Sequence, residues 1–218
     1  MNNKGKSPRR VARVNQRTLR ADLNRYLELA KQLGASDAKT IKARDVKVDE
    51  RVTMKCLVPR CYSCGESPNC PPYTPKADEM RAIISKYTYA ILFKLDIEPV
   101  GDFADKDLWP RGHISHYRKI FEIVGKLESQ MFNDAHYLAM GFAAGTCKAA
   151  LCDGLPCQFF DSGRCRFPLK ARPSMEAVGI DAFNLLSKVG WNVYPIGHKE
   201  TPPRLVPCAV AAGIVFVE

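Results

Sequence analysis

The sequence lacks any hydrophobic run long enough to cross a membrane. The longest such run, 209–217, is interrupted only by Gly213 and is much shorter than the roughly 20 residues that a transmembrane helix needs. The first 22 residues also lack the apolar stretch of a secretory leader, because they are polar and basic. We therefore expect a cytoplasmic protein with no membrane span.

Acidic residues are missing from the first 20 positions, which hold seven lysines and arginines. Residues 1–55 contain 15 basic and six acidic residues, against 18 and 17 in the rest of the chain, so nearly all of the net charge of +10 belongs to the N-terminal region. A segment with so little apolar surface does not collapse on its own. We predict a basic flexible arm over residues 1–18, followed by a single domain over residues 19–218.

The charge of this arm suits an acidic partner, for which we expect a redox partner protein. Nucleic acid is the less favoured partner, because the arm has no aromatic residue for base stacking before Tyr26. The sequence also lacks a phosphate-binding glycine loop, a nucleophile elbow and a dinucleotide fingerprint. No catalytic residue is therefore assigned, and an enzymatic role stays open.

In contrast to these absences, the sequence is rich in cysteine, with nine residues. Eight of them form two local sets of four, each interleaved with turn-forming proline and glycine. The first set is Cys56, Cys61, Cys64 and Cys70, and the second is Cys147, Cys152, Cys157 and Cys165. A chain of this length can bury a core without disulfides, so we predict that each set binds a metal cofactor. Cys208 is left over, and we expect it to be buried in an apolar strand.

Four cysteines can bind either zinc or an iron–sulfur cluster. Zinc sites usually present two Cys-x2-Cys pairs, whereas the only such pair here is Cys61–Cys64. Iron–sulfur ligands are often followed by proline, as Cys70 is by Pro71. We therefore predict two iron–sulfur clusters, of the [4Fe-4S] type, in an electron-transfer protein or a redox enzyme. The alternative is a zinc-stabilised binding module whose basic arm contacts nucleic acid or an acidic protein.

Several other polar residues are weaker candidates. His113 and His116, three apart on a predicted helix, could share a metal, but we expect a partly solvated helix face; His136 we assign to packing. Arg172 and Glu176 follow the second cysteine set. They either belong to a helix start capped by the serine between them, or face a cluster or an anionic substrate.

Hydrophobic periodicity predicts a layered α/β (or α+β) domain with a mixed sheet flanked by helices. The cysteine loops are expected at residues 56–72 and 145–170, each beside a strand. The predicted helices cover 19–33, 75–87, 110–132 and 180–189, and the predicted strands lie within 38–54, 89–97, 137–142, 191–194 and 205–217.

Three runs of residues resemble a known family. The sequences DERVTMKC, CPPYTP and CRFPLKARPSMEAVGID are similar to those of an uncharacterised family of cysteine-rich predicted metal-binding proteins found mainly in anaerobic microbes. The resemblance covers residues 27–217 and implies metal binding by the eight cysteines. One departure lies between Cys61 and Gly65, where the family often has Tyr-Gly, so whether Cys61 and Cys64 are both ligands stays open.

Overall fold

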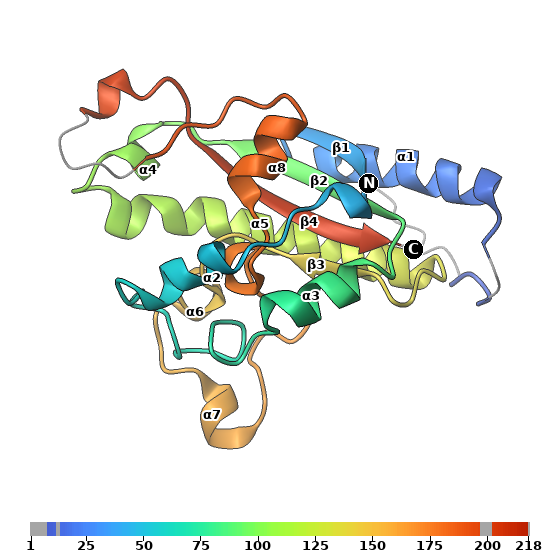
Figure 1. The fold of residues 1–218 in the computed structure, drawn as a ribbon, viewed down its shortest axis with the longest axis horizontal. Coiled ribbons are helices and arrows are strands. Elements are labelled where there is room, and N and C mark those ends of the chain that lie inside the picture. Colours follow the sequence, from blue (N-terminus) through green and yellow to red (C-terminus); the bar gives the residue numbers. More distant parts are fainter. Residues whose placement is uncertain (1–7, 12–13, 197–201, 218) are drawn as a thin grey trace.

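A four-stranded sheet in the order β1-β2-β4-β3 forms the centre of the fold (Figure 1). The structure is a computed structural model that describes residues 8–11, 14–196 and 202–217. Its strands are β1 (Asp37–Lys42), β2 (Tyr89–Asp96), β3 (Met140–Phe142) and β4 (Val210–Val217). Its helices are α1 (Gln16–Gln32), α2 (Glu50–Leu57), α3 (Ala77–Ile84), α4 (Gly101–Ala104), α5 (Trp109–Asn133), α6 (Cys147–Cys152), α7 (Gln158–Ser162) and α8 (Ala182–Lys188).

The sheet is antiparallel at each of its three strand pairs, so the mixed sheet that we expected is wrong. The chain does leave β2 and return through α5 to β3, which is the helical crossover that the alternating pattern indicates. However, β4 lies between β2 and β3 and pairs antiparallel with both. This split arrangement gives a layered α/β domain in which β2 and β3 never pair with each other.

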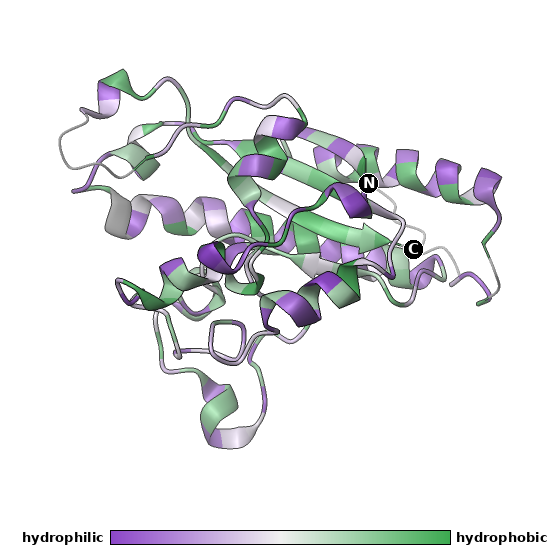
Figure 2. Cartoon of the chain, viewed as in Figure 1, coloured by the Kyte–Doolittle hydropathy of each residue, from purple (hydrophilic) through white to green (hydrophobic). Residues whose placement is uncertain are grey.

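Helices cover both faces of the sheet, and alternate residues of each strand supply the two cores. On one face, Phe93 of β2 and Val215 of β4 pack with α1 and α5. On the other, Leu92 and Phe216 pack with α3 and α8. Both central strands are therefore apolar along most of their length, as Figure 2 shows by their colour. The two-sided burial explains why 89–93 and 209–217 are continuous apolar runs.

The strand predicted within 38–54 is present only as β1, and the strand predicted at 191–194 is wrong. The alternation through Val52 and Met54 belongs to helix α2, which Asp49 starts by accepting a hydrogen bond from the backbone N–H of Arg51 at 3.0 Å. Residues 191–194 have no regular structure. There the buried Trp191 ring donates from Nε1 to Asp37 at 2.8 Å, so a side-chain contact replaces strand pairing. Cys208 precedes β4 and is only half-buried, which corrects its expected place inside a strand.

The N-terminal segment meets the domain through one charged contact. Arg9 donates to the Asp22 carboxylate of α1 at 2.5 and 2.9 Å, and its backbone N–H donates to the Asn133 carbonyl at 2.8 Å. Helix α1 begins at Gln16, with Asn15 as its cap. Much of the predicted arm, residues 1–7 and 12–13, lies outside the described residues, so the division at residue 18 stays a prediction.

Candidate metal centre

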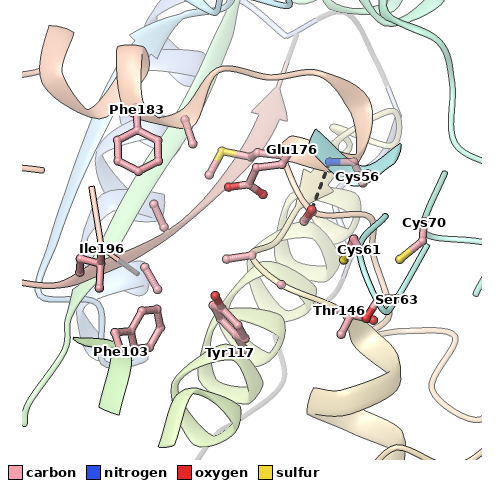
Figure 3. A pocket seen from close by; sticks show the side chains of 18 of the residues that line it. Cys56, Cys61, Ser63, Cys70, Phe103, Tyr117, Thr146, Glu176, Phe183 and Ile196 are labelled. Atoms are coloured by element: carbon pink, nitrogen blue, oxygen red, sulfur yellow. Dashed lines mark hydrogen bonds between the residues drawn. The ribbon is translucent and has the colours of Figure 1, made fainter. Parts of the chain in front are cut away.

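The first cysteine set lies at the end of α2 and in the loop that follows. Cys56 occupies the last turn of α2, and the Cys61 backbone N–H donates to its carbonyl at 3.0 Å. The Cys64 N–H then donates to the Cys61 carbonyl at 3.0 Å, which turns the chain again. All four cysteines of the set, Cys70 included, line one cavity of about 450 Å³. Figure 3 shows Cys61 and Cys70 at one end of this cavity.

The second cysteine set surrounds helices α6 and α7. Cys147 and Cys152 are the first and last residues of α6, Cys157 caps α7, and Cys165 follows it. All four line a second, smaller cavity of about 20 Å³. The backbone N–H of Phe167 donates to Cys165 Sγ at 3.3 Å, a hydrogen bond that would also stabilise a thiolate.

The two sets are neighbours, because the first loop also forms a wall of the second cavity. Asn69 Nδ2 lies 3.5 Å from Cys147 Sγ and donates to it. The Cys147 thiol lies 3.8 Å from the hydroxyl oxygen of Ser67, which is fully buried. In the other direction, Thr146 lines the first cavity. Residues 67–69 and Thr146 thus lie where the two cavities are closest to each other.

Burial keeps several of these thiols protonated in the absence of a metal. Burial, reinforced by the neighbouring cysteines, raises the pKa of Cys56 to about 11. Burial also raises the pKa of Cys70 and of Cys147, although hydrogen bonding with Ser67 at Cys70 and with Asn69 and Ser67 at Cys147 acts in the opposite direction. Binding a metal at either set would therefore release protons.

The structure brings the members of each set to one cavity but not into a single coordination shell. Within residues 8–11, 14–196 and 202–217, no group of three or more His, Cys, Asp or Glu side chains is placed to hold a metal ion. The first set does not follow a strand as expected, since α2 precedes it, whereas the second follows β3 closely. Each set nevertheless gathers around its own cavity.

The three candidate histidines, all within the described residues, lie away from both sets. His113 is buried against the Tyr117 ring rather than on a solvated face, and His116 Nε2 is 2.8 Å from Asp102. His136 packs, as expected, in a buried cluster where its Nε2 is 3.1 Å from Asp22. None of the three lines either cysteine cavity.

The residues that follow the second set were expected either to start a helix or to face the site, and the structure shows examples of both. Arg172 forms an ion pair with Glu128 at 2.6 Å and lines neither cavity. The Ser174 hydroxyl accepts from the Ala177 N–H at 3.2 Å at the start of a short 3-10 helix over Glu176–Val178, so a helix start is present as predicted, but Met175 rather than Ser174 is its N-cap. Glu176, in contrast, lines the first cavity, and burial raises its pKa.

The far end of the first cavity was not predicted from the sequence. Phe103, Tyr117, Phe183 and Ile196 line it, and in Figure 3 the Glu176 carboxyl group lies between this apolar end and the cysteines. These side chains come from four separate segments and have the spacing of ordinary core residues. The tight approach of Tyr117 to Gly145, where an added Cβ would collide with the ring, also gave no sequence signal beyond the glycine itself.

The fold and its two four-cysteine cavities define a layered α/β protein with two candidate metal sites. The described part of the chain contains no helix of the length and apolarity needed to cross a bilayer. A family model described as "Predicted metal-binding protein (DUF2284)" matches residues 39–210, and the chain belongs to this family. No curated protein and no solved structure matches the chain.

Proposed function

We propose that each cysteine set holds an iron–sulfur cluster of the [4Fe-4S] type and that this metal-binding protein transfers electrons. The observation that carries the proposal is the gathering of all four cysteines of each set around a separate cavity. Four thiols at one site are the complete ligand set of such a cluster. The first cavity has room for a cluster, whereas the second is small, so α7 and the loop to Cys165 would move outward to admit one.

Hydrogen bonds and charge around the sulfurs favour an anionic cofactor. Asn69 and the Phe167 backbone supply N–H groups to sulfur, and such bonds tune the reduction potential of a cluster. Basic residues also surround the cysteines. Exposed arginines stand beside both sets, at Arg60, Arg164 and Arg166. Zinc would use the same cysteines, and it is the alternative outcome of the metal analysis.

The closeness of the two sets supports relay from one cluster to the other and on to a partner. Tyr73 and Phe160, one from each cysteine loop, pack with ring centroids 5.2 Å apart and are both exposed. Phe159, whose ring centroid is 6.2 Å from that of Phe160 and which is also exposed, extends this apolar surface over α7, at the projecting tip of the molecule in Figure 1. With the arginines at its edge, the surface suits a redox protein that presents an acidic rim.

Metal content of matched cysteine variants tests the proposal. Cys64→Ser is expected to remove about half of the iron and leave the second cluster, because two sites with separate ligand sets lose metal independently. Cys208→Ser is the control, since Cys208 lines neither cavity, and it should retain all iron. Loss of all iron from Cys64→Ser would show ligands shared between the sets, and full retention by this variant would contradict a cluster at the first set.

A further inference from the structure

We propose that the cavity beside the first cysteine set binds a small, largely apolar amine, with Glu176 as the group that pairs with its ammonium. The presence of a cluster next to the bound amine rests on the proposed function. The binding of the amine in the cavity does not. The cavity volume of about 450 Å³ is within the range of small-molecule sites. A few polar groups among mainly apolar walls are also typical of such sites.

Glu176 is the acidic residue of the cavity wall. Its carboxyl group points into the cavity in Figure 3. No lysine, arginine or histidine among the described residues forms an ion pair with it, and the nearby Arg172 pairs with Glu128 instead. Among the described residues this half-buried carboxylate has no cation, and its hydrogen bond with the Ser174 side chain offsets the cost of desolvation only in part. An ammonium brought by a ligand would offset more of that cost.

Aromatic rings complete a surface that suits a cation. Phe103 and Tyr117 pack edge to face, with ring centroids 5.4 Å apart, and both line the cavity. Phe183 faces them across the cavity in Figure 3. Ring faces attract cations and also bury the apolar part of a ligand. An anion would find no such complement, because the cavity wall contains no lysine or arginine among the described residues.

The position of the cavity determines where a ligand would lie. Cys56, Cys61 and Cys70 form one end, the apolar side chains form the other, and Glu176 lies between them (Figure 3). An amine held by Glu176 would therefore extend its apolar part toward Phe103 and present its polar end toward the sulfurs. With a four-thiolate cluster at that end, the added negative charge would strengthen binding of a cation further.

Titration calorimetry with two nearly isosteric probes tests the proposal. 2-Phenylethylamine and 2-phenylethanol differ in the ammonium group, and each is titrated into the full-length, anaerobically purified protein of measured metal content. The amine should bind at least about tenfold more tightly than the alcohol, because the charge-assisted hydrogen bond is absent in the alcohol. Equal affinities, or no binding of the amine, would overturn the proposal.

Variants assign the binding to this cavity. Glu176→Gln should reduce amine affinity at least about tenfold and leave the alcohol unaffected, whereas Glu28→Gln, on the exposed side of α1, makes the same charge change and should alter neither. Phe183→Ala, at a side chain that is 58% exposed and so tolerant of truncation, should weaken both probes. Unchanged amine binding in Glu176→Gln and Phe183→Ala would overturn the proposal. If the anaerobically purified protein holds no cluster and still binds the amine at this cavity, the proposed function fails and the present proposal stands.

Discussion

Asp22 is the centre of a buried ionic cluster, and its replacement by Asn should destabilise the fold strongly. The side chain is 3% exposed and accepts from Arg9 at 2.5 and 2.9 Å, from Arg25 at 2.9 Å, and lies 3.1 Å from His136 Nε2. An asparagine side chain carries no charge to neutralise Arg9 and Arg25. Its amide nitrogen also takes the place of one carboxylate oxygen and cannot accept a hydrogen bond. Removing one partner of a fully buried ion pair typically costs about 3–5 kcal/mol, but the Arg9 and Arg25 side chains are 34% and 39% exposed and Arg25 keeps Asp134 as a partner. We therefore expect about 1.5–3 kcal/mol for Asp22→Asn, the cost of losing a hydrogen bond between charged groups.

The same cluster predicts a pH dependence. Burial alone would raise the pKa of Asp22, but hydrogen bonds from Arg9 and His136 outweigh it and lower that pKa below its ordinary value. A carboxyl with a lowered folded-state pKa contributes stability above its unfolded pKa of about 3.9 and loses it as the pH falls through the folded value. The unfolding free energy should therefore decrease below about pH 4, and Asp22→Asn should reduce that decrease.

Urea unfolding followed by circular dichroism measures both effects. The control is Asp78→Asn, whose side chain is 91% exposed and pairs with Arg81 in solvent, so its cost should be at most about 1 kcal/mol. If Asp22→Asn costs no more than this control at pH 7, or if its pH profile matches that of the unmodified protein, the reasoning about the buried cluster is refuted.

Three further predictions concern the loops and the N-terminal segment. Chelated protein should keep most of its far-ultraviolet circular dichroism, because the sheet core needs no metal, while residues 56–72 and 145–170 become protease-sensitive; a random-coil spectrum would contradict this. Gly145→Ala should lower the melting temperature more than Gly163→Ala, because both have positive φ (70° and 68°) but only the Cβ at 145 would collide with another side chain; equal shifts would refute that reason. Deleting residues 1–8 should leave iron content unchanged and weaken binding to an acidic redox protein at low salt only; a salt-independent effect would contradict steering by charge.

The long helices were predictable from the sequence because their apolar residues recur at three- and four-residue steps over several turns, a spacing that fits a helix and not a strand. The stripe from Leu19 to Leu33 and the apolar residues from Ile114 to Met131 lie in α1 and α5 as expected. The segment from Val46 to Met54 was not, because its apolar spacing fits a strand as well as one helical turn and Asp49 decides between them. The place of β4 between β2 and β3 depends on packing between distant segments, which a single sequence does not encode locally.

The candidate site shows the same division. The grouping of the cysteines was predictable because each set is local in sequence, and each set does line one cavity. The apolar end of the first cavity was not, because Phe103, Tyr117 and Phe183 come from three helices and each matches an ordinary core position. For Glu176 the sequence left two interpretations open, a helix start or a residue that faces the site. Both apply, because Glu176 begins the short 3-10 helix over Glu176–Val178 and also lines the first cavity.

The central claim is that the two cysteine sets hold iron–sulfur clusters, and the iron and acid-labile sulfide content of anaerobically purified protein tests it most directly. Two [4Fe-4S] clusters predict about eight iron and about eight sulfide per chain, in a brown protein whose visible absorption bleaches on reduction. A colourless protein with stoichiometric zinc and no sulfide would contradict the account.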